Sequence, residues 1–160
     1  MTHGSHLFRR FALMMSVPAL MGLIGTRFTL AINCTESLPE HVFLIDKADK
    51  TDFAEQDFIA FTSLNMPPIP DGLTIVKKVA GRGGDQIRVI DREVFIHETR
   101  LARAKPVSDA GTPLSVTREM VVPEHYYYVH APHPDSYDSR YANVGLIGPA
   151  RIVGRAYVIF

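Results

Sequence analysis

The chain opens with one long apolar run and then changes to short apolar segments separated by turn residues. The pair Arg9-Arg10 precedes the apolar run 11–25, and apolar residues recur as far as Ile32. As one helix, this stretch of roughly 22 residues would span about 33 Å, enough to cross the hydrocarbon core of a bilayer. Basic residues before the run favour a cytoplasmic amino terminus. We therefore predict a cytoplasmic tip and a single transmembrane anchor in residues 1–32.

Two other interpretations of this segment stay open. It could be a cleaved signal peptide, although no small-x-small cleavage site follows the run, or a buried helix of a soluble protein. The stretch 30–34 loosely resembles a lipoprotein processing site, but Asn33 stands where a small residue is needed before Cys34. If the anchor is correct, Arg27 lies near the far interface, where its long side chain can reach water.

After the predicted anchor, the pattern is one of short strands. Seven segments are rich in β-branched and aromatic residues, turn formers separate them, and no amphipathic helix is expected. The predicted strands are 42–45, 57–61, 74–80, 86–90, 93–96, 126–130 and 151–160. We therefore predict a mainly β, extracytoplasmic domain over residues 33–160.

Composition removes several classes of function. The 160 residues suit one domain with a single core. Seventeen basic residues balance seventeen acidic ones without a basic cluster, so a nucleic-acid partner is not expected. Cys34 is the only cysteine, which excludes an intrachain disulfide and a thiolate metal cluster.

The first candidate motif is Thr35-Glu36-Ser37-Leu38-Pro39, directly after the predicted anchor. A serine before a proline-containing turn is common in surface loops, so the motif alone indicates no chemistry. Its position is more informative, because a tethered enzyme would meet a substrate emerging from the bilayer there.

The second candidate motif is the pair Lys77-Lys78 within the apolar strand 74–80. Successive side chains of a strand point to opposite faces, so one lysine can be solvated while the other lies among apolar neighbours. Desolvation lowers a lysine pKa, and a fall of about three, worth roughly 4 kcal/mol, gives a neutral base near pH 7–8. The alternative is an edge strand with two exposed lysines.

The third candidate motif is the polar stretch 134–141, which follows the predicted strand 126–130. In an extended chain, Asp138 and Arg140 lie on the same side and can form an ion pair. Ser136 could then hydrogen-bond a nearby base. The alternative is a polar surface loop.

Taken in this order, the three motifs resemble signal peptidase I and its relatives, most closely the TraF-type peptidases of conjugative plasmid transfer. Ser37-Leu38-Pro39 resembles their nucleophile turn, and the lysine strand followed by Gly84-Asp85 is similar to their base-bearing segment. The stretches 122–129 and 136–141 resemble their last conserved box, and 152–156 resembles their closing strand. The resemblance implies a signal peptidase-like β domain and a membrane-bound serine endopeptidase with no cofactor and no metal.

The resemblance also implies a role for each matching residue. Ser37 would be the nucleophile and Lys77 its general base, in a serine–lysine dyad. The Ser37 backbone N–H and the Thr35 hydroxyl would form the oxyanion hole. The supporting residues would be Ser136, which orients the lysine, and the pair Asp138 and Arg140, in which Asp138 is a candidate third catalytic member.

The substrate implied by the resemblance is an exported precursor, in particular a conjugative pilin that is cleaved or cyclised. The location would be the bacterial inner membrane, with the catalytic domain in the periplasm and with conjugation or type IV secretion components as partners. A general signal peptidase, a non-catalytic membrane-tethered module of a secretion system and a self-cleaving repressor are the alternatives. A metal site at His125, His130 and His133, near Asp135, is a further alternative.

The dyad predicts different outcomes for the two neighbouring lysines. Ser37→Ala and Lys77→Ala should abolish cleavage of a precursor, because each removes one member of the dyad, whereas Lys78→Ala should retain it. The measurement is the fraction of precursor cleaved by each purified variant. Ordinary activity in the Lys77→Ala enzyme would reject the dyad.

Overall fold

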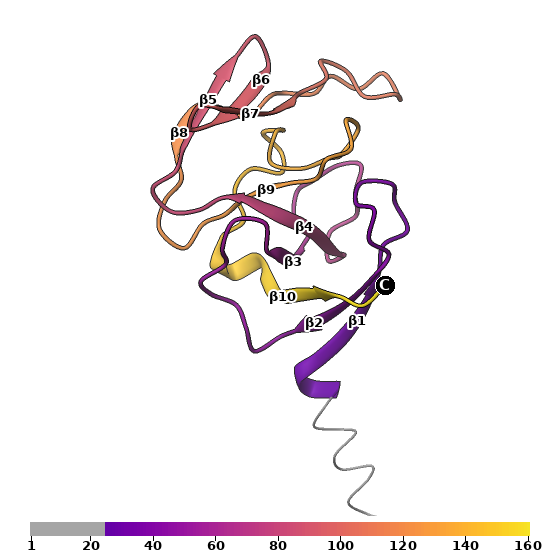
Figure 1. Ribbon diagram of the computed structural model, residues 1–160. Helices are drawn as coiled ribbons and strands as arrows, with labels where there is room; N and C mark the ends of the chain where they lie inside the picture. The colour runs from indigo at the N-terminus through magenta and orange to yellow at the C-terminus, as the bar shows by residue number, and fades with distance from the viewer. Residues whose placement is uncertain (1–24) are drawn as a thin grey trace, which may run out of the picture.

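The computed structural model describes residues 25–160, which form two antiparallel β-sheets and the short 3-10 helix η1 (Pro149–Arg151). The larger sheet has the strand order β1-β2-β10-β3-β4-β9, and the smaller sheet has the order β7-β6-β5-β8 (Figure 1). The larger sheet consists of β1 (Phe28–Ile32), β2 (Val42–Asp46), β3 (Phe58–Thr62), β4 (Thr74–Gly81), β9 (Tyr128–His130) and β10 (Ile152–Val158). The smaller sheet consists of β5 (Gln86–Ile90), β6 (Glu93–Ile96), β7 (Thr99–Arg103) and β8 (Met120–Val121).

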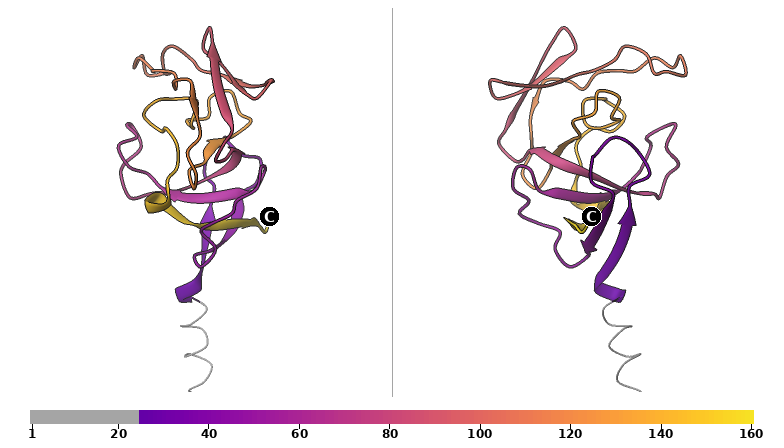
Figure 2. Two further views of the ribbon diagram at one scale, coloured as in Figure 1. Left: turned by 90° about the vertical axis from the view of Figure 1, so that its left-hand side faces the viewer. Right: turned by 45° about the vertical axis from the view of Figure 1, so that its right-hand side comes forward.

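The smaller sheet lies at the end of the molecule opposite to β1, as both views in Figure 2 show. It is formed by the chain between β4 and β9, and a tight turn at Gly84-Asp85 leads into it. Gly84 has φ +92°, a conformation that favours glycine, and the Asp85 carboxylate accepts the Arg82 N–H at 2.8 Å. The chain therefore leaves the larger sheet and enters the smaller one at a well-defined turn.

The mainly β fold predicted from the sequence is confirmed. All seven predicted segments contain a strand, with boundaries shifted by a few residues. The strands β7 and β8 were not predicted, because each is short or interrupted by polar residues. The grouping of β5 to β8 into a separate sheet was also not visible in the pattern.

The extension of the predicted membrane helix through Phe28, Leu30 and Ile32 is wrong. These residues form β1, which pairs antiparallel with β2 from Phe28↔Asp46 to Ile32↔Val42. Arg27 does not stand apart from the β domain but forms an ion pair with Asp46, with Nη2 2.7 Å from Oδ2. The physical reason is that β2 offers a free edge, and pairing there satisfies the backbone of an apolar segment that could equally have been helical.

The apolar run 11–24 lies outside the described residues, so the anchor itself stays a prediction, as does the division of the chain at residue 32. Within residues 25–160, none of the helical segments has the length and apolar character needed to cross a bilayer.

The buried side chains form three clusters, of which one positions the site. This cluster, called here the turn cluster, consists of Leu38, Phe43, Ile45, Ala60, Ala131 and Ala156. It joins the segment before β2 to the segment after β9, which are far apart in the sequence. Close packing continues to β10, where a Cβ on Gly154 would lie 2.1 Å from the Asp46 carbonyl oxygen. Glycine is therefore required where β10 passes the backbone of Asp46 at the end of β2.

Candidate active site

The predicted nucleophile Ser37 lies in the loop between β1 and β2. The Asn33 backbone N–H donates to the His41 carbonyl at 2.8 Å and so continues the pairing of the two strands beyond Ile32. Leu38, the residue after Ser37, is 1% exposed and belongs to the turn cluster. Because Leu38 is fixed in the core, the serine beside it has a defined position.

The hydroxyl groups of Thr35 and Ser37 are in direct contact, with their oxygens 2.8 Å apart. Thr35 Oγ1 also donates to Asn33 Oδ1 at 2.8 Å. A hydroxyl has one proton to donate, so in the contact between the two hydroxyls Ser37 is the donor and Thr35 the acceptor. The predicted nucleophile and the predicted oxyanion-hole residue therefore form one hydrogen-bonded unit.

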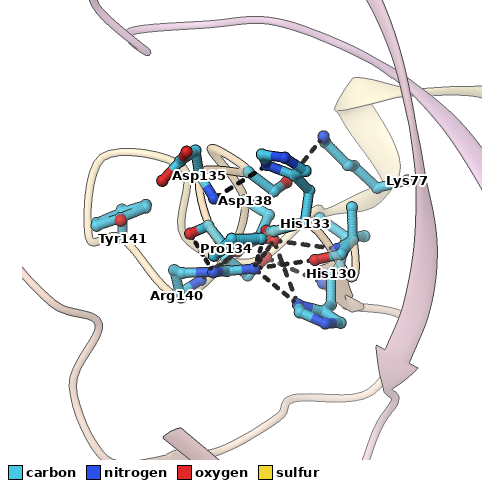
Figure 3. Close-up of polar contacts among 12 residues, drawn as sticks. Lys77, His130, His133, Pro134, Asp135, Asp138, Arg140 and Tyr141 are labelled. Atoms are coloured by element: carbon cyan, nitrogen blue, oxygen red, sulfur yellow. Dashed lines mark hydrogen bonds and ion pairs between the residues drawn. The ribbon is translucent and has the colours of Figure 1, made fainter. Parts of the chain in front are cut away.

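The predicted base Lys77 lies on β4 with 4% of its surface exposed. Its Nζ donates to Ser136 Oγ at 3.0 Å (Figure 3). Burial lowers the pKa of Lys77 to about 8, while the charge of Asp138 raises it and that of Arg140 lowers it. With that pKa, roughly one molecule in ten has a neutral amine at pH 7.

The neighbouring Lys78 points to the other face of β4. Its Nζ lies 3.4 Å from Glu40 Oε1 and 4.8 Å from the centre of the Phe58 ring. The Glu40 carboxylate and the Phe58 ring are both partners that a cationic side chain prefers. The two lysines thus occupy opposite environments, and Lys77 is the one that lies in the desolvated position.

Asp138 and Arg140 form a buried ion pair behind Lys77. Arg140 Nε donates to Asp138 Oδ1 and Nη2 donates to Oδ2, each at 2.8 Å, and the Ala131 N–H donates to Oδ2 at 3.0 Å (Figure 3). Burial alone would raise the pKa of Asp138, but hydrogen bonds from His130 and Arg140 outweigh it and hold this pKa well below its ordinary value. Asp138 is therefore a carboxylate whose oxygens are occupied by donors.

A cleft of about 750 Å³ brings together four of the predicted residues. Thr35, Ser37, Lys77 and Ser136 line it, whereas Asp138 and Arg140 do not. Within the described chain, Ser37 and Lys77 are not hydrogen-bonded to each other. Instead, the Ser37 hydroxyl contacts Thr35, and Lys77 Nζ donates to Ser136. Such catalytic contacts are often long before substrate binds, so a shared cleft is compatible with a dyad.

The cleft also contains a free strand edge. Strand β3 pairs with residues 74–78 of β4, while β9 pairs only with residues 78–81. Among residues 25–160, the segment 74–77 therefore lacks a strand partner on one side, and residues 74–77 all line the cleft. The lining also includes Ala31 and Ile32 of β1, and most of the surface of the cleft is apolar.

The three histidines considered as metal ligands do not form such a site. His130 Nδ1 lies 3.3 Å from Asp138 Oδ2 and so belongs to the buried ion pair. His133 Nδ1 instead accepts the Asp135 N–H at 3.2 Å. In the described part of the chain, no group of three or more His, Cys, Asp or Glu side chains could hold a metal ion.

Two residues of the site were not recognised in the sequence. Asn33 was noted only as incompatible with a lipoprotein site, although an asparagine two residues before Thr35 is a typical start of an Asx turn. His130 was noted only as a metal-ligand candidate, and nothing in its sequence neighbourhood indicated its contact with Asp138.

Comparison with known proteins identifies the family. The family described as signal peptidase, peptidase S26, matches residues 6–160. No curated protein matches the chain significantly. A solved signal peptidase I from Enterococcus faecalis V583 is 24% identical, with an alignment that covers 66% of this chain and 97% of that one at a TM-score of 0.40, a likeness too low to assign residues. On the family match, the chain belongs to the signal peptidase family, peptidase S26, and is a serine endopeptidase that processes exported precursors.

Proposed function

We propose that the enzyme uses Ser37 as its nucleophile and Lys77 as its general base. The observation that carries this proposal is a buried lysine with a pKa of about 8 in the same cleft as a serine hydroxyl. Neutral Lys77 takes the proton of Ser37 while Ser37 Oγ attacks the scissile carbonyl carbon. Lys77 then gives that proton to the leaving amine, and an acyl group stays on Ser37 until water or another amine attacks it.

The oxyanion of this reaction is stabilised by the Ser37 backbone N–H and the Thr35 hydroxyl. Thr35 lies in hydrogen-bond contact with Ser37, which supports the assignment. The hydroxyl donates to Asn33 in the resting enzyme, so it must turn toward the oxyanion as negative charge develops. One such donor is worth about 2.7–4 kcal/mol of barrier lowering.

Ser136 and the ion pair are assigned supporting roles. Ser136 Oγ accepts a hydrogen bond from Lys77 Nζ and so holds the amine in the cleft. Asp138 is assigned a positioning role instead of a catalytic one, because its oxygens are bonded to Arg140 and Ala131 and it does not line the cleft. The pair also fixes the segment that carries Ser136.

The substrate binds as an extended strand along residues 74–77 of β4. The free edge of this segment offers backbone donors and acceptors, which is the basis of recognition by β-augmentation. Apolar walls formed by Ala31, Ile32 and Ile75 favour apolar side chains of the substrate. The resemblance to signal peptidases adds a preference for small residues at and near the cut.

The finer function proposed is that of a TraF-type peptidase, anchored in the bacterial inner membrane with its cleft in the periplasm. Support comes from the serine turn, the lysine strand and the Ser136–Tyr141 stretch, and from the apolar run 11–25 just before β1. The substrate is then a conjugative pilin precursor, and the acyl group on Ser37 is transferred to an amine of the same chain. General removal of leader peptides is the second candidate, because it uses the same acyl-enzyme.

The base assignment predicts how activity depends on pH. The value of kcat/KM for a precursor peptide should rise with pH with an apparent pKa near 8, because only the neutral amine of Lys77 can accept the proton. If kcat/KM, measured at intervals of about one pH unit, stays constant from about pH 6 to about pH 10, Lys77 is not the general base.

A control variant links this profile to Lys77. The pKa of Lys77 is lower in the folded chain than its ordinary 10.5, so the unfolded state binds more protons between about pH 8 and pH 10.5. Stability of the native enzyme should therefore rise with pH across that window. Lys77→Met removes the buried charge, so its melting temperature should exceed that of the native enzyme at pH 6 and the difference should shrink above pH 8.

The proposed cyclisation predicts the mass of the product. A pilin precursor with a free amino terminus should give a product lighter by one water than the linear cleaved chain, because an amine replaces water in attacking the acyl group. Mass spectrometry of the reaction mixture measures this. The matched control is the same precursor with an acetylated amino terminus, which can give only the linear product. If the free precursor also gives only that product, the enzyme is a hydrolase of the leader-peptidase kind.

The anchor predicts where the protein is found after cell fractionation. The full-length chain should stay in the membrane pellet after alkaline extraction, because the apolar run 11–25 is held by the hydrophobic effect and not by charge. A chain lacking residues 11–24 is the matched control and should be released. Recovery of the full-length chain in the alkaline supernatant would show that the anchor is wrong.

A further inference from the structure

Every polar atom of the Asn33 side chain is used to shape the serine loop. The amide nitrogen Nδ2 donates to the carbonyls of Leu38 at 3.0 Å and Glu40 at 3.1 Å. The amide oxygen Oδ1 accepts the Thr35 backbone N–H at 3.0 Å and the Thr35 hydroxyl at 2.8 Å. A side-chain amide has two donors and two lone pairs, so this one is fully satisfied. Asn33 thus contacts both ends of the loop that carries Ser37.

These contacts set the direction of a short hydrogen-bond chain. Thr35 gives its hydroxyl proton to Asn33, so it accepts the proton of Ser37. Asn33 therefore determines where two hydroxyl protons lie in the resting enzyme. The proton of the nucleophile points to Thr35 and not to Lys77, whose Nζ is bonded to Ser136.

The acceptor that Asn33 offers to Thr35 is a neutral amide oxygen. A ground-state substrate carbonyl is an acceptor of the same kind and would not draw the Thr35 hydroxyl away from it. The charged oxygen of the tetrahedral intermediate is a stronger acceptor and would. An interaction made only when charge develops lowers the barrier without tightening substrate binding, so its loss affects kcat more than KM.

We propose that Asn33 is a positioning residue that acts through Thr35: it holds the Thr35 hydroxyl beside Ser37 and releases it to the oxyanion during acylation. This role rests on the proposed function of Ser37 and Thr35. It involves only an exchange of hydrogen bonds, with no bond formed or broken by Asn33.

A double-mutant cycle on the full-length enzyme tests this role. Asn33→Ala should lower kcat for a precursor peptide by at least about tenfold while changing KM by less than about threefold. In a Thr35→Val background, which lacks the hydroxyl, the same Asn33→Ala change should lower kcat by less than about threefold. In a Thr35→Ser background, which keeps the hydroxyl, the full loss should return.

The alternative is that Asn33 only braces the loop through Leu38 and Glu40. In that case Asn33→Ala would lower kcat by the same factor with or without the Thr35 hydroxyl, and this additive result would overturn the proposal. Circular dichroism checks that each variant is folded. If the Asn33→Ala enzyme does not fold, Asn33→Ser replaces it in the double-mutant cycle. A serine at this position can still accept a hydrogen bond from the Thr35 N–H in a local turn.

Two further variants separate this proposal from the proposed function. Gln86→Ala removes an exposed amide on β5 of the other sheet and should leave kcat unchanged. Ser37→Ala should be inactive. Activity in the Ser37→Ala enzyme would overturn the assignment of Ser37 as the nucleophile and, with it, the role of Asn33. An inactive Ser37→Ala together with an additive cycle would overturn the role of Asn33 alone.

Discussion

The proposed chemistry depends most on the burial of one amine, Lys77, which water would otherwise keep charged. Burial is the largest influence on its pKa, and the nearby charges of Asp138 and Arg140 act in opposite directions. Because these two residues neutralise each other, neither fixes the lysine as an ammonium. A lone carboxylate at this position would raise the pKa of the amine and make it unsuitable for the proposed role as a base. The ion pair therefore gives the site a rigid frame at little electrostatic cost to Lys77.

The sheet places this amine by the simplest property of a strand, the alternation of its faces. Lys77 and Lys78 are adjacent, yet one is bonded to Ser136 in the cleft and the other to Glu40 on the opposite face. The same strand changes partner at its midpoint, from β3 at residues 74–78 to β9 at residues 78–81. The half that carries Lys77 therefore ends beside an unpaired edge. One strand and its register therefore place both the proposed base and the edge proposed to bind the substrate.

Much of this arrangement could be predicted from the sequence, because it follows from local patterns. The strand 74–80, its alternation and the pairing of Asp138 with Arg140 need only spacing and residue type. The strand β1 could not be predicted, since Phe28–Ile32 continues an apolar run and only the free edge of β2 decides its conformation. The contact of His130 with Asp138 and the separate sheet of β5 to β8 depend on long-range packing in the same way. Asn33 is different: the Asx-turn signal was present, but its contacts to Leu38 and Glu40 become visible only once the loop is closed.

The serine turn and the lysine strand are joined by packing and not by a direct hydrogen bond. Leu38 follows the proposed nucleophile, Ala131 precedes the segment that carries Ser136, and both belong to the turn cluster. A shift of the serine loop would therefore open a cavity in the core, at a cost of about 2–5 kcal/mol for a residue the size of leucine. The proposed nucleophile, although it lies on a loop, is thus held almost as firmly as a side chain on a strand. The hydroxyl hydrogens can still change direction, because rotating an O–H bond requires no movement of the packed atoms. Substrate can then redirect the protons of Thr35 and Ser37 while the heavy atoms that carry them stay in place.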